Sequence, residues 1–410
     1  MKNKKQSSLF ISYNGLTDPL GQSQILPYVI GLSKSGYEMS ILSSEKRDRF
    51  KAKESEISSI CKTHGIKWIP LFFHTSPPIL AKYYDYISLK NKATNLYREN
   101  NYDIIHCRSF LAARIGAELK KKFNCKYLFD MRGFWVDERV DGGIWDLSSP
   151  FYRYAYKKYK KKEDYLVGYA DGIVCLTEAG KIEIQKWKSY QPSVPITVIP
   201  CSADLELFSV VSEDEKILAK QLLGIKEGAF VLSYLGSLGT WYLLEEMLQL
   251  FNKIAEKYNE AVFLILTPDD PKIVYQSASK FGIDPSKLVI TFAERKDVPI
   301  FMKASNVSVS FIKPAYSKIA SSPTKLGELL SMGIPVICNQ IGDVGLVLQQ
   351  SGGGVLLPDF SNASYDFVIE QLPMLMELDS AEIRSNIYEY YSLDNAIKTY
   401  YHVYNKLLSS

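Results

Sequence analysis

A lysine and a glutamate three residues apart, Lys325 and Glu328, are the residues of this sequence with the clearest chemical meaning. They follow Ser322 and Pro323, which are typical of a helix N-cap and a first helical residue, so a helix is predicted to begin here. A lysine in a first turn is unfavourable by roughly 0.3–1 kcal/mol, because the backbone N–H groups there already carry partial positive charge. The same lysine is favourable if a diphosphate binds at the helix start.

The neighbouring residues fit the same interpretation. Gly327 costs about 1 kcal/mol in a helix relative to alanine, and its missing side chain would let a ligand approach. Glu328 lies one turn after Lys325, where its carboxylate could accept the hydroxyls of a ribose. A solvated lysine–glutamate pair on a surface helix is the alternative. The predicted ligand-binding residues of this helix are Ser322, Thr324, Lys325, Leu326 and Glu328.

Composition restricts the class of protein. A chain of 410 residues with 46% hydrophobic content predicts a globular protein of two domains. The net charge of +4 is too small to indicate nucleic-acid binding. Six cysteines without a C-x-x-C pair and only four histidines predict neither a disulfide framework nor a zinc site. The sequence has no signal-peptide pattern and no apolar run of about 18 residues, so we expect a cytoplasmic protein.

Short apolar runs alternate with longer amphipathic stretches along the whole chain, which is typical of βαβ units around parallel sheets. The pattern predicts two doubly wound, Rossmann-like α/β domains over residues 1–200 and 201–391, with a C-terminal helix over 392–410 that packs back toward the first domain. Because ligands bind at the carboxyl ends of such strands, the site is expected in a cleft between the domains. Strands are predicted at 8–14, 37–44, 66–73, 102–109, 125–133, 171–179, 196–208, 229–237, 261–268, 288–294, 307–314, 334–340 and 353–359.

Several motifs resemble those of the GT-B nucleotide-sugar glycosyltransferases, especially family 4. The segment E-L-L-S-M-G-I-P-V-I at 328–337 is similar to the family's E-x4-G-x-P-V-I. Further landmarks occur in the family's order over about residues 8 to 400: a glycine turn at 13–15, D-I-I-H at 103–106, V-I-P-C-S-A-D-L-E-L-F at 198–208 and Y-L-G-S-L-G at 234–239.

The resemblance implies a GT-B fold and transfer of a sugar from a nucleotide-sugar donor to a glycan, a lipid-linked sugar or a similar hydroxyl acceptor. It implies a role in the synthesis of cell-surface polysaccharide or glycoconjugate. It further implies retention at the anomeric carbon, no metal and no other cofactor. The C-terminal domain would bind the donor and the N-terminal domain the acceptor. A sugar-nucleotide 2-epimerase of the same fold and a non-catalytic partner subunit remain alternatives. A dinucleotide-dependent dehydrogenase is disfavoured, because no G-x-G-x-x-G follows the first strand.

Two positions depart from the family pattern. The family's Glu-x7-Glu signature has Ala320 in place of its first glutamate, and S-S-P-T-K follows, as in a subset of these transferases. The turn at Gly236 and Ser237, predicted to contact the donor, is not followed by the usual arginine and lysine. We therefore infer that Lys325 neutralises the diphosphate, together with Arg295 or Lys313.

The N-terminal domain contributes the predicted acceptor and catalytic residues. Gly15, Gly21 and Gln22 lie in a loop that opens into a helix and could present N–H groups to an acceptor, although a plain strand-to-helix turn explains them too. His106 ends an apolar strand, and the resemblance implies that it approaches the transferred sugar. A lone histidine is more often structural.

The segment 130–139 combines charged residues with a tryptophan after a strand end. Arg132, Asp137 and Glu138 could hold sugar hydroxyls, and Trp135 could stack on a sugar ring; a surface ion-pair loop is the alternative. In a retaining reaction the leaving phosphate can help to deprotonate the acceptor, whereas an inverting reaction would require a base such as Asp137 or Glu138.

Tyrosines and lysines alternate along residues 151–165, which resembles an interfacial helix that docks on anionic lipid. A solvated charged face is the alternative. The predicted protein is therefore cytoplasmic, with a peripheral contact at the inner face of the cell membrane as a further hypothesis.

Overall fold

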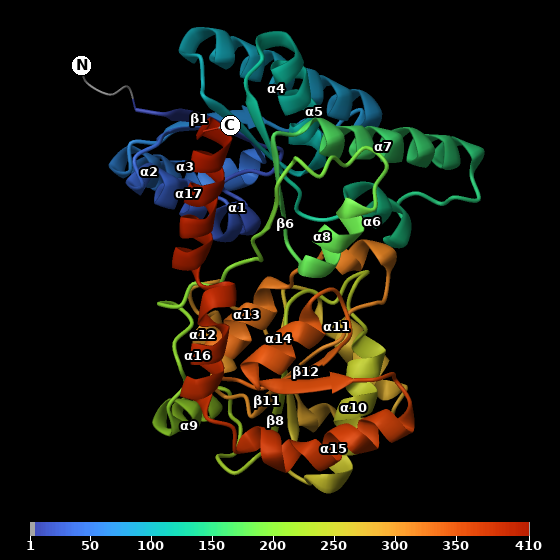
Figure 1. The fold of residues 1–410 in the computed structure, drawn as a ribbon. Helices are drawn as coiled ribbons and strands as arrows, with labels where there is room; N and C mark the ends of the chain where they lie inside the picture. Colours follow the sequence, from blue (N-terminus) through green and yellow to red (C-terminus); the bar gives the residue numbers. More distant parts are fainter. Residues whose placement is uncertain (1–4, 410) are drawn as a thin grey trace. The chain divides into compact units, whose positions relative to one another are not determined.

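The computed structural model describes residues 5–409 and divides them into two compact units. Unit 1 contains the chain up to Pro200, the segment Tyr316–Ser321 and the chain from Leu393 onward. Unit 2 contains Cys201–Ala315 and Ser322–Ser392. The segment Tyr316–Ser321 was predicted to lie in the second domain, and its place in unit 1 is a result of the tertiary structure. Figure 1 shows the fold.

Unit 1 is built on a parallel sheet of seven strands in the order β3-β2-β1-β4-β5-β6-β7. The strands alternate with helices along the chain, as expected for βαβ units. The strands are β1 (Ser7–Ser12), β2 (Glu38–Glu45), β3 (Lys67–Phe72), β4 (Ile104–Arg108), β5 (Lys126–Asp130), β6 (Gly172–Cys175) and β7 (Ile196–Val198). The helices are α1 (Pro19–Gln24), α2 (Leu26–Lys34), α3 (Arg47–Thr63), α4 (Pro78–Asn100), α5 (Ser109–Phe123), α6 (Trp135–Asp141), α7 (Pro150–Tyr169), α8 (Glu178–Gln185), the 3-10 helix η2 (Tyr316–Ala320) and α17 (Leu393–Ser409).

Side chains on the two faces of this sheet belong to different cores. On β1, Leu9 and Ile11 pack with residues of α4, α5 and α7, whereas Phe10 packs with residues of α2, α3 and α17. Since successive side chains of a strand point to opposite faces, helices cover the sheet on both sides. The carboxyl ends of its strands remain the edge at which polar side chains can gather.

Unit 2 repeats this architecture with a parallel sheet of six strands in the order β10-β9-β8-β11-β12-β13. The strands are β8 (Val231–Leu235), β9 (Val262–Leu266), β10 (Leu288–Thr291), β11 (Val307–Ser310), β12 (Val336–Asn339) and β13 (Gly354–Leu357). The helices are α9 (Glu213–Leu222), α10 (Leu244–Lys257), α11 (Pro271–Ser279), the 3-10 helix η1 (Pro285–Lys287), α12 (Val298–Met302), α13 (Thr324–Ser331), α14 (Val344–Ser351), α15 (Asn362–Met376) and α16 (Ser380–Tyr391).

The sheet of unit 2 also has a core on each face. Leu232 and Tyr234 pack with α10, α11 and α15, and Val336 packs with α13, α14 and α16. The predicted strands of both domains are present, and the two doubly wound α/β domains are confirmed. Within residues 5–409, no helix has both the length and the apolar character needed to cross a membrane.

Candidate functional site

Lys325 lies in the first turn of α13 and is almost completely buried. The helix begins at Thr324 with Pro323 as its N-cap residue, so the prediction of Ser322 as the N-cap is wrong by one residue. Ser322 does not cap the helix because its Oγ accepts a hydrogen bond of 3.3 Å from the backbone N–H of Cys201. Lys325 therefore stands among N–H groups that have no acceptor within the helix.

Two tyrosine rings surround the ammonium of Lys325. Its Nζ lies 3.7 Å from the ring centroid of Tyr242 and 4.4 Å from that of Tyr234, and it donates a hydrogen bond of 3.2 Å to the Tyr234 Oη. Burial lowers the pKa of Lys325 from 10.5 to about 7, while Cys338 and Glu328 act in the opposite direction. Because this pKa lies near neutral pH, an anion that binds beside Lys325 would shift the side chain toward its protonated form.

Gly236 brings the turn after β8 against this lysine. Its φ of +128° is a conformation that favours glycine, and a Cβ at this position would lie 2.6 Å from Lys325 Nζ. The next residue, Ser237, offers its carbonyl to the Tyr234 Oη at 2.5 Å. The structure therefore brings three predicted donor residues, Gly236, Ser237 and Lys325, to one place.

Glu328 and Arg295 form an ion pair in unit 2. Arg295 Nη1 lies 2.7 Å from Glu328 Oε1, and the carboxylate is buried while the guanidinium is partly exposed. Arg295, one of the two predicted companions of Lys325, therefore contacts the site through Glu328. Lys313, the other one, is exposed. Because Glu328 keeps a second carboxylate oxygen, it retains acceptor capacity for a hydroxyl.

Gly327 does not leave space for a ligand, and this prediction is wrong. A Cβ at residue 327 would lie 2.6 Å from Cδ1 of Tyr391, whose buried ring belongs to α16. The glycine is needed for close packing of α13 on α16. Leu326 is also buried in the core of unit 2, so only its backbone can contribute to binding, and the side chain of Thr324 is partly exposed.

In unit 1, the predicted acceptor loop is closed around a buried carboxylate. Glu45 accepts hydrogen bonds from the backbone N–H groups of Leu16 (2.8 Å) and Thr17 (3.1 Å), and from the Thr17 hydroxyl (2.6 Å). A Cβ on Gly15 would lie 2.3 Å from Glu45 Oε2. These two N–H groups therefore bind a carboxylate of the chain itself rather than facing an acceptor.

Gly21 and Gln22 have contacts within the same loop region. A Cβ on Gly21 would lie 2.0 Å from the Gly15 carbonyl oxygen, so the glycine allows α1 to pack on the loop. The Gln22 amide donates to the Thr17 carbonyl at 3.1 Å and accepts from Lys53 Nζ at 3.1 Å. These contacts give both residues a structural role. Their binding of an acceptor stays a prediction.

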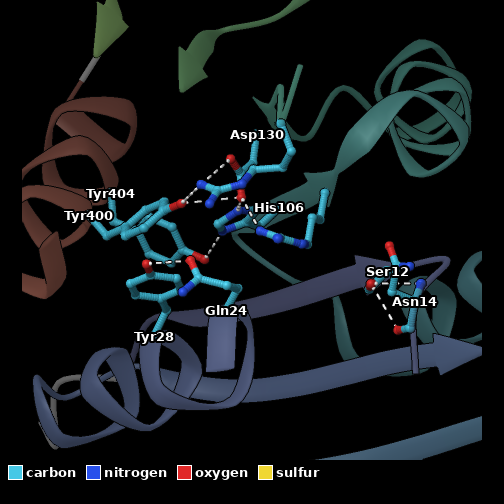
Figure 2. A network of polar contacts seen from close by, with 10 residues as sticks. Ser12, Asn14, Gln24, Tyr28, His106, Asp130, Tyr400 and Tyr404 are labelled. Atoms are coloured by element: carbon cyan, nitrogen blue, oxygen red, sulfur yellow. Dashed lines mark hydrogen bonds and ion pairs between the residues drawn. The ribbon is translucent and has the colours of Figure 1, made fainter. Parts of the chain in front are cut away.

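His106, the third residue of β4, lies inside a polar network with Asp130 at the end of β5 and with α17 (Figure 2). Its Nδ1 lies 2.9 Å from the Tyr404 Oη, and its Nε2 lies 3.3 Å from Asp130 Oδ2. Tyr400 also donates a hydrogen bond to Asp130, at 3.2 Å. The imidazole is 1% exposed, so in this conformation it does not reach a substrate.

The network fixes the charges of its members. Burial lowers the pKa of His106, and Asp130 only partly opposes this effect, so the ring is neutral at pH 7. Burial by itself would raise the pKa of Asp130, but Arg132, His106 and Arg108 lower it overall. Arg132 Nη1 lies 3.5 Å from Asp130 Oδ1, which places this predicted catalytic residue in the same network.

The other predicted residues of segment 130–139 lie on or near α6. Asp137 is buried and bound to Tyr156 Oη (2.9 Å) and Lys160 Nζ (2.5 Å) of α7. Trp135 stacks on Phe110 with ring centroids 4.7 Å apart. Both side chains join α6 to its neighbouring helices, which favours structural roles for them.

Glu138 differs from these two because its side chain is 34% exposed. Its Oε1 lies 3.4 Å from Lys318 Nζ, on the segment Tyr316–Ser321. Among the described residues, no group of three or more His, Cys, Asp and Glu side chains is placed to hold a metal ion.

Comparison with solved structures identifies the fold. Sucrose-phosphate synthase from Thermosynechococcus elongatus superposes with a TM-score of 0.72 at 14% identity, over 99% of this chain and 100% of that chain. The Anabaena protein HepE, in a structure with UDP and glucose, gives a TM-score of 0.68 at 13% identity, over 97% and 99% of the two chains. This chain has the GT-B fold.

Sequence comparisons agree with the GT-B assignment. The family model described as Glycosyltransferase Family 4 matches residues 27–207. A protein of Methanocaldococcus jannaschii described as an uncharacterised glycosyltransferase is 21% identical over 315 residues, which are 74% of this chain and 75% of that protein. The residues of this chain that match the family model therefore lie almost entirely in unit 1.

Several residues of these GT-B units were not singled out from the sequence. Two of them are Tyr234 and Tyr242, which surround Lys325. Asp130, the centre of the His106 network, belongs to the segment 130–139 that was predicted to hold sugar hydroxyls. Tyr234 precedes the Gly236 turn by only two residues, so an aromatic residue before a glycine turn was the available signal. The contacts of Tyr400 and Tyr404 with β4 and β5 span about three hundred residues and had no local signal.

Proposed function

We propose that this chain is a glycosyltransferase that takes a sugar from a nucleoside diphosphate donor bound at the start of α13. The observation that carries the proposal is the environment of Lys325, a buried lysine beside the Gly236 turn and among the N–H groups of a helix start. The ring contacts of Lys325 and its hydrogen bond are made to two tyrosines, Tyr234 and Tyr242, which do not neutralise an ammonium. A diphosphate supplies the missing charge.

The chemistry required of the site is stabilisation of the leaving diphosphate. Charge grows on the phosphate oxygens as the bond to the sugar breaks, and prearranged donors and cations stabilise it. Lys325 can supply a full charge at this stage, because its lowered pKa rises again beside an anion. We propose that Glu328 binds the ribose hydroxyls with its second carboxylate oxygen while Arg295 binds the first.

We further propose that the reaction retains the anomeric configuration and needs neither a metal nor another cofactor. Lys325 and the N–H groups of α13 would perform the charge stabilisation that a metal provides in other enzymes. Addition of EDTA is expected to leave turnover unchanged, and product analysis by NMR reports the configuration. A loss of turnover with EDTA that Mg²⁺ restores would reject the metal-independent mechanism.

UDP-sugars are the first donors to test, because the HepE structure contains UDP and glucose. The proposed acceptor is a glycan or lipid-linked sugar that binds to unit 1, in the synthesis of a surface polysaccharide or glycoconjugate. The product would then carry the transferred sugar on a hydroxyl of this acceptor.

The exposed side of α7 supports a membrane-bound acceptor. Phe151 and Tyr154 are more than 60% exposed, and Arg153, Lys157, Lys158 and Lys161 are exposed beside them. The opposite side of the helix holds the buried Glu163. An amphipathic helix with exposed aromatic and basic residues fits the surface of an anionic bilayer. Sedimentation with vesicles of anionic and neutral lipid tests this contact, and equal binding to both would contradict it.

Titration calorimetry against UDP-, GDP-, dTDP- and CMP-sugars tests the donor site. We expect one nucleotide class to bind, and we expect Lys325→Ala and Glu328→Ala each to weaken its binding by about tenfold or more. Lys272→Ala is the matched control, since Lys272 is an exposed lysine of the same unit, on α11. Unchanged affinity in both site variants would remove the basis of the proposal.

The same protein preparation distinguishes a transferase from a 2-epimerase. Incubation with a labelled nucleotide sugar and extracted lipid acceptors should give labelled lipid. Release of the free epimer without labelled lipid would identify an epimerase, and binding without any product would identify a non-catalytic subunit.

A further inference from the structure

The segment Tyr316–Ser321 is anchored in unit 1 although the chain on both sides of it belongs to unit 2. Tyr316 stacks on Phe134 with centroids 5.4 Å apart and donates a hydrogen bond of 2.8 Å to Glu183 of α8. The backbone N–H of Ser317 donates to Asp141 Oδ2 of α6, also at 2.8 Å. The segment is therefore held by specific contacts with two helices of unit 1.

The second half of the segment is held even more closely. The Thr177 hydroxyl donates to the Ile319 carbonyl at 2.8 Å. Ala320 is 2% exposed within the core of unit 1, and a Cβ on Gly180 would lie 3.1 Å from the Ala320 Cβ. A glutamate at residue 320, where the Glu-x7-Glu signature has its first glutamate, would therefore place a carboxylate in buried surroundings.

Only Ser321, Ser322 and Pro323 separate Ala320, the last residue of the segment whose packing is described above, from Thr324, the first residue of α13. Three residues span roughly 10 Å of chain at most. Proline restricts one of them further, because its φ is fixed. The first turn of α13, which carries Lys325, is therefore tethered by a short chain to a segment bound to α6 and α8.

We propose that Tyr316–Ser321 is a positioning segment that couples the donor helix α13 to the α6 region of unit 1. The inference rests on the proposed function, in which α13 binds the donor and unit 1 binds the acceptor. Tyr316, Ser317 and Lys318 are positioning residues: they hold the segment, and the segment holds the helix start. Donor binding itself uses residues of unit 2 and does not require the anchor.

The test compares an undocking variant with a matched control. Tyr316→Ala combined with Lys318→Ala removes the ring stack, the Glu183 hydrogen bond and the Glu138 ion pair. Tyr275→Ala combined with Lys272→Ala changes a tyrosine of similar exposure and a lysine on α11 of unit 2. Hydrogen exchange of residues 322–326 needs no ligand, and we expect it to become at least about tenfold faster in the undocking variant only.

Kinetics give the second readout. We expect kcat of the undocking variant to fall by about tenfold or more while the donor Kd stays within about twofold of the native value. Tyr316→Phe, which keeps the ring stack, should recover most of the loss relative to Tyr316→Ala. Unchanged hydrogen exchange at 322–326 would overturn the proposal, and so would a donor Kd that weakens in parallel with kcat.

The two proposals fail in distinguishable ways. If the native chain bound no nucleotide sugar, the proposed function would be rejected, whereas the hydrogen exchange of residues 322–326 would still decide whether the segment holds α13.

Discussion

Replacement of Lys325 by methionine should stabilise the protein while it abolishes donor binding. The side chain is buried between Tyr234 and Tyr242, and a methionine of similar length suits this apolar environment. Burial lowers the pKa of Lys325 from 10.5 to about 7, so the folded protein holds this proton much less tightly than the unfolded chain does. At about 1.4 kcal/mol for each pKa unit, the difference destabilises the folded protein by on the order of 5 kcal/mol when both states are protonated.

The pH dependence of this effect has a definite sign. Below pH 7 the lysine is charged in both states, so the full cost of burying the ammonium is present. Between about pH 7 and 10.5 the unfolded chain binds a proton that the folded protein lacks, so the native protein gains stability as the pH rises. Lys325→Met should therefore be most stabilising at pH 6 to 7, by on the order of 4 kcal/mol, and the gain should vanish toward pH 10.

Denaturant unfolding at pH 6, 7, 8 and 9 measures this difference, and calorimetry with the donor measures the loss of binding. The exposed Lys272 again provides the control, because Lys272→Met should change stability little at any of these pH values. A Lys325→Met variant that is less stable than the native protein at pH 6 would refute the conclusion that the lysine is buried at a cost in stability.

Three further predictions concern other contacts. Donor binding at pH 8 should take up close to one proton in the native protein, measured by calorimetry in buffers of different ionisation enthalpy. The absence of proton uptake would separate Lys325 from the diphosphate. Gly327→Ala should destabilise the protein by about 1–3 kcal/mol, because the new methyl group would meet the Tyr391 ring, even though alanine favours helix formation. A melting temperature equal to or higher than that of the native protein would contradict this packing. His106→Ala should destabilise the protein by about 2 kcal/mol or more through loss of its bonds to Tyr404 and Asp130, while the donor Kd in calorimetry changes little. Because the lowered pKa keeps His106 neutral in the folded protein, native stability should fall as the pH drops through 6.5. A histidine that merely lies on the surface would give neither effect.

Secondary structure was predictable because the signal for it is local. Each strand is a short apolar run between helical stretches, and the fully buried parallel strands of both units keep such runs intact. The predicted N-cap of α13 was wrong by one residue, and no local sequence pattern could have indicated this. The Ser322 hydroxyl is bound to Cys201, which lies 121 residues earlier in the sequence.

The candidate site was predictable in part for the same reason. Lys325, Gly236 and Glu328 were identified because each is locally anomalous or part of a motif, and the structure places Lys325 beside Gly236. Burial reversed the interpretation of other residues. His106 and Asp137 carry groups capable of acid–base chemistry, yet their partners come from α17 and α7, and these partners enclose them.

The sequence by itself determined the two parallel α/β domains and indicated the start of α13 as a candidate anion site, because periodicity, helix-start chemistry and motif order are properties of neighbouring residues. Only the tertiary structure decided what surrounds those residues. It filled the space beside Gly327 with Tyr391, enclosed Lys325 between two tyrosines, and placed Tyr316–Ser321 in unit 1. These outcomes depend on contacts between residues far apart in the chain, and burial, which sets both pKa and accessibility, is created by such contacts alone.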